Sequence, residues 1–150
     1  MSNTFIQASF FDLGDTLVNN SHSWLTGAKT TLDRLRQKSI RLGIISNTGN
    51  LARPSILNLL PADFDLGIFE ANLVIFSSEV NVQKPQPQIF QLAIERAGLE
   101  SNKCLFCTED LLDTLVAQQV GMRTARLLKP PSGDVGDLES KLAAAGLIPV

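Results

Sequence analysis

Four groups of residues in this sequence have the types and positions needed for chemistry, because each lies just after an apolar run or just before a helix. They are Asp12 with Gly14, Ser46 with Asn47, Lys84, and Glu109 with Asp110 and Asp113. Carboxylates can act as nucleophiles, and hydroxyl and ammonium groups can bind an anion. We expect these residues to lie together, because the carboxyl ends of parallel strands meet at one edge of a sheet.

The elements that must position these residues alternate along the chain between strand-like and helix-like segments. Strands are predicted at 5–11, 40–45, 73–76, 103–107 and 124–128, and helices at 24–37, 51–60, 87–97, 111–120 and 138–145. Within the first helix, for example, Leu25, Ala28 and Leu32 recur at helical spacing. The alternation predicts an α/β fold with a Rossmann-like, doubly wound, mainly parallel sheet and helices on both faces.

Length and composition predict one ordinary soluble domain over residues 1–150. The chain has 44% hydrophobic residues, 19% charged residues and a formal net charge of −2. This balance gives no electrostatic signal for binding nucleic acid or an anionic membrane. No apolar run reaches the roughly 18 residues of a membrane span, and the N-terminal residues lack the pattern of a signal peptide. We therefore expect a cytoplasmic location.

Cys104 and Cys107 form a Cys-x-x-Cys pair, which is a redox motif when it opens a helix. Here the pair lies in an apolar run that predicts a strand. Because residues three apart on a strand point to opposite faces, two buried free thiols are the favoured interpretation.

The run Phe10-Phe11-Asp12-Leu13-Gly14-Asp15-Thr16-Leu17 resembles the first signature of the haloacid dehalogenase-like (HAD) hydrolase superfamily, Asp-x-Asp-x-Thr after a hydrophobic strand. Asp12 and Thr16 match this signature, and Gly14 replaces its second aspartate. The run Ile44-Ile45-Ser46-Asn47 is similar to the second signature, a strand that ends in Ser or Thr.

Two further signatures follow later in the chain. Residues 84–90 read Lys-Pro-Gln-Pro-Gln-Ile-Phe and look like the third signature, Lys-Pro-x-Pro-x-Ile-Phe, which is the closest match. Glu109 and Asp113, with Gly121-Met122 after the following helix, are similar to the fourth, usually Gly-Asp with a second Asp downstream. Order, spacing and strand-end placement agree at four points, so the chain is identified as a member of this superfamily.

The resemblance implies a magnesium-dependent phosphatase in which Asp12 and Lys84 are catalytic. Asp12 would attack a phosphate monoester in line and give an aspartyl phosphate that water then hydrolyses. Ser46, Asn47 and Lys84 would bind the phosphoryl oxygens. The implied Mg²⁺ ligands are the Asp12 carboxylate, the Gly14 carbonyl oxygen and an acid of the fourth signature, Asp113 or Glu109.

Gly14 departs from the family pattern at the residue that usually protonates the leaving oxygen and activates the attacking water. A glycine does neither, although its carbonyl oxygen can still bind metal. Asp15 lies one residue further on, where the side chain normally turns away from the site. Two hypotheses therefore stand: a phosphatase that is slow, and a non-catalytic module of the same fold that binds a phosphorylated ligand or a protein. A hydrolase acting on carbon–halogen or carbon–phosphorus bonds is a weaker third.

No cap domain is predicted, because residues 17–40 and 49–73 each hold little more than one helix. An uncovered site suits a phosphorylated small molecule or a bulky or macromolecular phosphorylated substrate. It also suits a second copy of the chain or a partner chain that acts as a lid. The sequence leaves these alternatives open.

Simpler structural roles compete with each functional assignment. Asp12 could cap a turn, Ser46 and Asn47 could belong to a turn, and Lys84 could be solvated. Acidic residues at 109–113 are favoured by the dipole of the helix that follows them. His22 is the single histidine and lies in a polar loop near the expected site, where a surface role is more common than a catalytic one.

Overall fold

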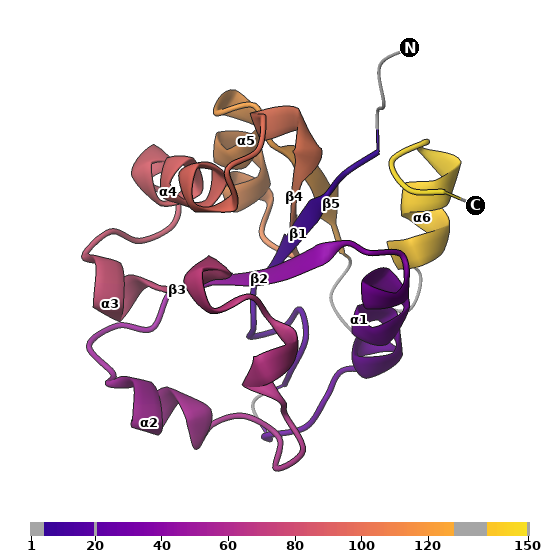
Figure 1. The fold of residues 1–150 in the computed structure, drawn as a ribbon. Coiled ribbons are helices and arrows are strands. Elements are labelled where there is room, and N and C mark those ends of the chain that lie inside the picture. The colour runs from indigo at the N-terminus through magenta and orange to yellow at the C-terminus, as the bar shows by residue number, and fades with distance from the viewer. Residues whose placement is uncertain (1–4, 20, 128–137, 150) are drawn as a thin grey trace.

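Five parallel strands form the central sheet of the described part of the chain, which the computed structural model gives as residues 5–19, 21–127 and 138–149 (Figure 1). The strands are β1 (Ala8–Phe11), β2 (Arg41–Ser46), β3 (Val74–Phe76), β4 (Cys104–Thr108) and β5 (Arg123–Arg126). Their order in the sheet is β3-β2-β1-β4-β5, and all neighbours are parallel. The strand order reverses beside the central β1, which is where open α/β sheets bind ligands.

Helices cover both faces of this sheet, as predicted. The helices are α1 (Ala28–Gln37), α2 (Arg53–Leu57), α3 (Ser77–Val80), α4 (Pro87–Ala97), α5 (Leu111–Gln119) and α6 (Leu138–Ala144), with short 3₁₀ turns η1 (Leu66–Ile68), η2 (Ala71–Leu73) and η3 (Ser101–Lys103). Helices α1 and α6 lie on one face, and α4 and α5 lie on the other (Figure 1).

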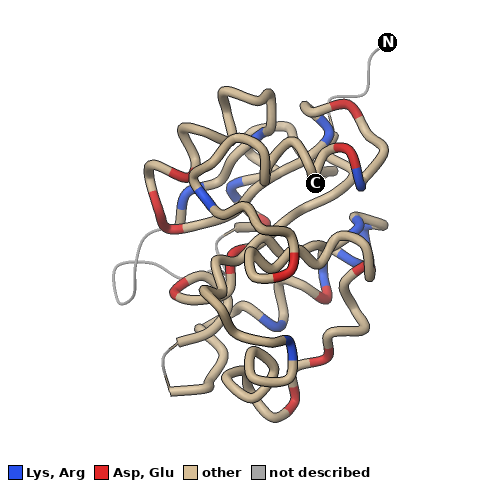
Figure 2. Tube along the Cα trace, turned by 90° about the vertical axis from the view of Figure 1, so that its left-hand side faces the viewer, with Lys and Arg blue, Asp and Glu red and all other residues tan. Residues whose placement is uncertain are grey.

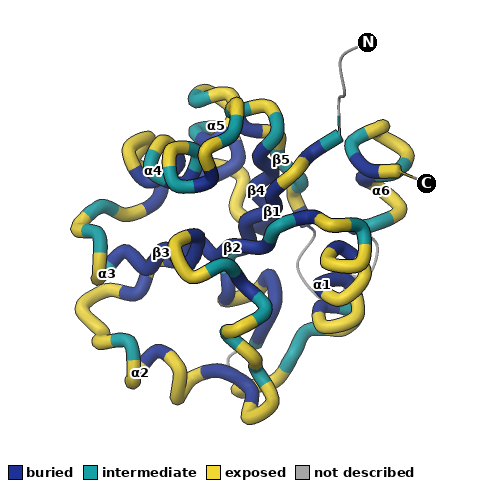
Figure 3. Tube along the Cα trace, in the orientation of Figure 1, coloured by how far each residue is buried: buried dark blue, intermediate teal, exposed yellow. Residues whose placement is uncertain are grey.

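The strands are buried from both sides because successive side chains alternate between two hydrophobic clusters. Phe10 belongs to the cluster that α4 and α5 cover, and Phe11, the next residue, belongs to the cluster that α1 and α6 cover. Ile45 and Ile44 divide in the same way. Figure 3 shows the strands as the buried centre, with exposed residues on the outer sides of the helices.

The pairing register places Asp12 at the carboxyl edge of the sheet. Phe11 aligns with Ile44 of β2 and with Cys107 of β4. Asp12 follows directly and its backbone N–H still donates to Cys107 O (3.1 Å). The ends of β1, β2 and β4 therefore lie level, and the residues that follow them meet at one edge.

Most of the predicted elements are confirmed, and the main difference has a local cause. Helix α1 begins at Ala28 and not at 24, because Gly27 adopts a left-handed φ of 81° and Trp24 pairs with Val18 in an isolated bridge. Helix α2 is shorter than predicted but has Pro54 in its first turn, as expected. Helix α3 was not predicted. The predicted loop at 129–133 lies outside the described residues.

The connections that could carry a cap are short. Between β1 and β2 the described residues hold a loop and α1, and between β2 and β3 they hold α2, η1 and η2. Neither connection holds a domain that could cover the edge of the sheet, which agrees with the prediction.

The two cysteines are buried free thiols on opposite faces of the sheet, as predicted. Burial raises the pKa of the Cys104 thiol to about 11 and that of the Cys107 thiol to about 12. Both thiols are protonated near neutral pH, which is the opposite of the thiolate character that a redox cysteine needs.

Basic and acidic residues are interspersed along the chain (Figure 2). Within the described ranges, no helix has both the length and the apolar character that a bilayer span requires.

Candidate active site

The Asp12 carboxylate is held in one orientation by three neighbouring groups. The Leu13 backbone N–H donates to Asp12 Oδ1 (2.8 Å). Lys84 Nζ lies 2.9 Å from Asp12 Oδ2, and the Thr108 hydroxyl donates to the same oxygen (3.4 Å). The side chain is 16% exposed, so it can be reached from the open edge of the sheet. This is the placement expected for a nucleophile.

Lys84 brings an ammonium group to the same point from a distant part of the chain. Its side chain is only 3% exposed, and Nζ lies 2.9 Å from Asp12 Oδ2 and 3.5 Å from Asp113 Oδ2. The ammonium also lies 5.4 Å from the centre of the Phe106 ring. A buried cation requires such partners, because an unpaired charge out of water is very costly. The first, third and fourth signatures therefore converge as predicted.

Asn47 holds the backbone of Lys84 in place. Asn47 Nδ2 donates to Lys84 O (2.9 Å), and the Lys84 N–H donates to Asn47 Oδ1 (2.8 Å). Both ends of the side-chain amide are therefore used on Lys84, which is joined to Pro85 by a cis peptide bond. Phosphate binding by Asn47 stays a prediction. Because the side-chain amide is already bonded to Lys84, the backbone N–H of Asn47 is the group that would bind phosphate.

Asp113 lies in the first turn of α5, whose N-terminus is capped by Asp110. Asp110 Oδ1 accepts from the Asp113 N–H (3.0 Å), so Asp110 has a structural role. Burial raises the pKa of Asp113, and the nearby Lys84 ammonium opposes that shift. The Thr108 hydroxyl oxygen accepts from the Asp110 N–H (3.2 Å) and thereby links this turn to the Asp12 carboxylate.

The remaining residues of the first two signatures border the site. Ser46 is buried at the end of β2, and its role as a phosphate ligand stays a prediction. Gly14 is exposed, and a Cβ added there would meet no atom within 4 Å. Asp15 is exposed, has a left-handed φ of 59°, and makes none of the ion pairs found among the described residues. It does not replace the missing aspartate.

The oxygen donors at this edge fit a magnesium ion, although they do not form a three-acid cluster. Over the described residues, no group of three or more His, Cys, Asp or Glu side chains is close enough to hold a metal ion. Glu109, half-buried after β4, thus does not complete such a group with Asp12 and Asp113. Those two carboxylates meet at Lys84, and Mg²⁺ usually binds through one or two carboxylates and keeps several waters.

The Gly14 carbonyl oxygen is a further candidate ligand. The turn that contains it is closed by the N–H groups of Thr16, Leu17 and Val18, which all donate to Leu13 O. Among the described residues, none donates to the Gly14 carbonyl. A backbone oxygen at this position is therefore available to an ion, as the resemblance implies.

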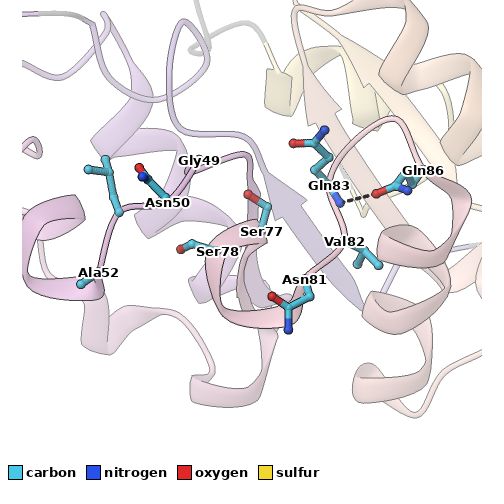
Figure 4. Close-up of a pocket in the computed structure, with 10 residues that line it drawn as sticks. Gly49, Asn50, Ala52, Ser77, Ser78, Asn81, Val82, Gln83 and Gln86 are labelled. Carbon is cyan, nitrogen blue, oxygen red and sulfur yellow. Dashed lines mark hydrogen bonds between the residues drawn. The ribbon is translucent and has the colours of Figure 1, made fainter.

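Two hollows lie near these residues, and only one borders the site. A pocket of about 240 Å³ is lined by Gly14, Ser46 and Asn47, by the polar residues Asn19, His22 and Thr48, and by apolar side chains. A larger hollow of about 580 Å³ lies between the loop after β2, α3 and the segment before α4 (Figure 4). None of the predicted site residues lines this larger hollow.

Sequence reasoning missed two features of this site. It did not foresee that the Thr108 hydroxyl contacts Asp12, because the predicted strand ended at 107. It also did not foresee that the Asn47 side chain binds the backbone of Lys84. A hydroxyl residue between a strand and an acidic turn was the available signal for the first feature, whereas the second depends on how two loops meet.

A parallel sheet with a carboxylate, a lysine and a second carboxylate at its carboxyl edge is the arrangement expected of an α/β hydrolase. The family model for haloacid dehalogenase-like hydrolases matches residues 14–127. The chain belongs to this family.

Curated relatives include phosphatases. A glyceraldehyde 3-phosphate phosphatase from Pyrococcus abyssi is 38% identical over 101 residues, which are 65% of this chain and 40% of that protein. A phosphatase from Mycobacterium tuberculosis is 28% identical over 97 residues, 64% of this chain and 42% of that protein. The chain thus spans about two fifths of the length of these relatives.

Solved structures share the fold. A HAD-like hydrolase from Porphyromonas gingivalis has a TM-score of 0.73 at 17% identity and covers 92% of this chain and 98% of its own. A HAD family enzyme from Bacteroides thetaiotaomicron, in complex with magnesium and inorganic phosphate, has a TM-score of 0.64 at 16% identity. The match covers 83% of this chain and 96% of that enzyme's chain.

Proposed function

We propose that the protein is a magnesium-dependent phosphatase that hydrolyses phosphate monoesters through an aspartyl phosphate at Asp12. The observation that carries this proposal is the position of Lys84 Nζ, 2.9 Å from Asp12 and 3.5 Å from Asp113. It puts a fixed positive charge beside an orientated carboxylate at an open strand end. The phosphatase names of two relatives, and a structural neighbour in complex with magnesium and phosphate, support the same reaction.

In the first step, an Asp12 carboxylate oxygen attacks phosphorus from the side opposite the ester oxygen. The bond between phosphorus and the ester oxygen breaks, and the alcohol leaves with the bonding electron pair and takes up a proton. Lys84 balances the charge on the phosphoryl oxygens, and the Ser46 hydroxyl and nearby backbone N–H groups donate to them.

In the second step, water attacks the phosphorus of the aspartyl phosphate. The bond between phosphorus and the Asp12 oxygen breaks, which releases orthophosphate and restores the carboxylate. Since Gly14 has no side chain, no acid or base at this position assists either proton transfer. General acid–base catalysis is typically worth about 10²–10⁴-fold, so we expect slow turnover.

Magnesium would be held by Asp12, Asp113 and the Gly14 carbonyl oxygen, with water completing its coordination. When bound, it supplies positive charge that offsets the repulsion between the carboxylate nucleophile and the phosphate. Phosphorylated small molecules and phosphorylated macromolecules are both candidate substrates, and a second copy of the chain or a partner chain is a candidate lid for the open edge.

The proposal is tested by measuring phosphate release from p-nitrophenyl phosphate with Mg²⁺ and with EDTA. We expect weak turnover with the metal and a loss of about tenfold or more without it. Absence of turnover with Mg²⁺ would contradict the proposal. That result would favour the second candidate, a non-catalytic module that binds a phosphorylated ligand, for which the missing acid at Gly14 is the supporting observation.

Replacing Gly14 by aspartate is expected to raise turnover of alkyl phosphates by about tenfold or more. The new side chain supplies the absent proton donor, and an added Cβ at this position meets no atom within 4 Å. The measurement is kcat for glycerol phosphate, and Gly14→Asn is the matched control because it has the same shape without the acid. Equal gains in both variants would show that the proton donor is not what limits the reaction.

A further inference from the structure

The pocket of about 240 Å³ beside the site has a mixed lining. Its polar part is Gly14, Asn19, His22, Ser46, Asn47 and Thr48, and two of these, Ser46 and Asn47, are also proposed phosphate ligands. Its apolar wall is built from Leu13, Val18, Leu51, Ile56, Leu59 and Leu60. Val18, Ile56 and Leu60 of this wall are buried, whereas Leu51 and Leu59 are 38% and 49% exposed. A phosphate bound beside Ser46 would therefore direct its organic group toward an apolar wall.

The two sides of this pocket are tied together without any ligand. Val18 lies on the loop after β1, and Leu59 lies just after α2. Trp24 from the first side stacks on Phe64 from the second, with ring centroids 5.0 Å apart. Asp63 also accepts from Trp24 Nε1 (2.8 Å). The pocket is therefore held open, as ligand pockets usually are.

The size of the pocket suits one aromatic ring. A dry apolar cavity of about 150 Å³ binds benzene. The larger volume here leaves room for the ring and for the ester oxygen that joins it to phosphorus.

The absence of a side chain at Gly14 points to the same kind of ester. With no proton donor there, the leaving group has to depart as an anion or take its proton from solvent. A phenol has a pKa of about 10 and leaves readily as an anion, whereas an alkyl alcohol has an acidity near that of water, with a pKa of about 15.7. The absence of a proton donor at position 14 therefore lowers the hydrolysis rate of an aryl ester less than that of an alkyl ester.

We propose that the substrates are aryl phosphate monoesters, with the aromatic ring in this apolar pocket and phenolate as the leaving group. The inference rests on the proposed phosphatase function. The bond that breaks joins phosphorus to the phenolic oxygen, which keeps the electron pair and is protonated by solvent. The ring is that of a free aryl phosphate or of a phosphotyrosine side chain.

The pocket is tested first by binding alone, which does not depend on turnover. Phenylphosphonate and methylphosphonate carry the same anionic head, and neither can be hydrolysed at an ester oxygen. We expect the protein to bind phenylphosphonate about tenfold more tightly by calorimetry. Leu59→Ser should remove most of this preference. The matched control is Leu115→Ser, which should keep it, because Leu115 is 47% exposed and Leu59 is 49% exposed but only Leu59 lines the pocket. Equal binding of both phosphonates overturns the assignment of the pocket.

Turnover then tests the leaving group. Phenyl and benzyl phosphate both present a ring, but only the first releases a phenol. We expect kcat/KM for phenyl phosphate to exceed that for benzyl phosphate by about 10²-fold. Equal values would overturn the inference, because another group, such as His22 on the pocket lining, would then be protonating the leaving oxygen.

Two further arms of the experiment complete the test. A phosphotyrosyl peptide is measured beside phenyl phosphate. Hydrolysis of both would identify phosphotyrosine side chains as the substrate, and hydrolysis of phenyl phosphate alone would identify a free aryl phosphate. Glycerol phosphate hydrolysed as fast as phenyl phosphate would overturn the aryl preference and leave the phosphatase function intact. A retained preference for phenylphosphonate without turnover of any ester would overturn the phosphatase function and keep the pocket.

Discussion

Replacement of Asp12 by asparagine is expected to lower phosphate-ester turnover by about 10³-fold or more, because the amide cannot form the aspartyl phosphate. The fold should survive the change. Asparagine has the same shape, the Leu13 N–H can still donate to its carbonyl oxygen, and Lys84 keeps its contact with Asp113 at 3.5 Å. The measurement is phosphate release from p-nitrophenyl phosphate with Mg²⁺, together with urea unfolding to compare stability.

Asp15→Asn is the matched control for this variant. Asp15 is also an acid of the loop after β1, but it is exposed and makes no ion pair with the site. Its left-handed backbone conformation is one that asparagine adopts readily. We expect its activity to stay within about twofold of the wild-type value. Equal turnover by the wild type and by the Asp12→Asn variant would remove Asp12 as the nucleophile.

Replacement of Lys84 by methionine is expected to lower turnover by about 10²–10³-fold, because the fixed charge that balances the phosphoryl oxygens is lost. Methionine fills the volume of the lysine stem, and the Asn47 side chain bonds only to the backbone of Lys84. The polypeptide path should therefore persist. Stability at neutral pH should fall, since the Asp12 and Asp113 carboxylates would face each other without the ammonium between them.

Lys29→Met provides the comparison for a lysine outside the site. Lys29 pairs with Asp63 at 2.7 Å, but both side chains are 57% exposed, so the pair contributes little to stability. Binding of orthophosphate, measured by calorimetry, separates the two roles of Lys84. Wild-type phosphate affinity in the Lys84→Met variant would show that Lys84 acts only as a structural partner of the two acids.

The sheet and its helices could be predicted because each element carries its own periodic signal. Helix α4 begins at Pro87 and ends before Gly98, as expected from a proline suited to the first turn and a glycine with a left-handed φ of 67°. The start of α1 could not be predicted in this way. Its position depends on the bridge between Val18 and Trp24, which the local pattern of apolar residues does not contain.

The candidate site was predictable to the level of which residues converge. Asp12 and Lys84 were placed together from strand ends and from the resemblance, and the structure has them 2.9 Å apart. The hydrogen bonds that orient them were not predictable. The contacts from Asn47 to Lys84 and from Thr108 to Asp12 join residues 37 and 96 positions apart, and they depend on how separate loops meet.

The pair of hydrogen bonds between Asn47 and Lys84 has a consequence for how the site assembles. The lysine is anchored by Asn47, which follows β2 and precedes β3 in the chain, so no single stretch of the chain can build the proposed anion-binding centre by itself. The centre exists only after the loop beyond β2 and the segment leading into α4 have both docked. If either of these two segments opens locally, we expect activity to be lost while the hydrophobic core stays folded. Activity would then be lost at a lower denaturant concentration than the core structure.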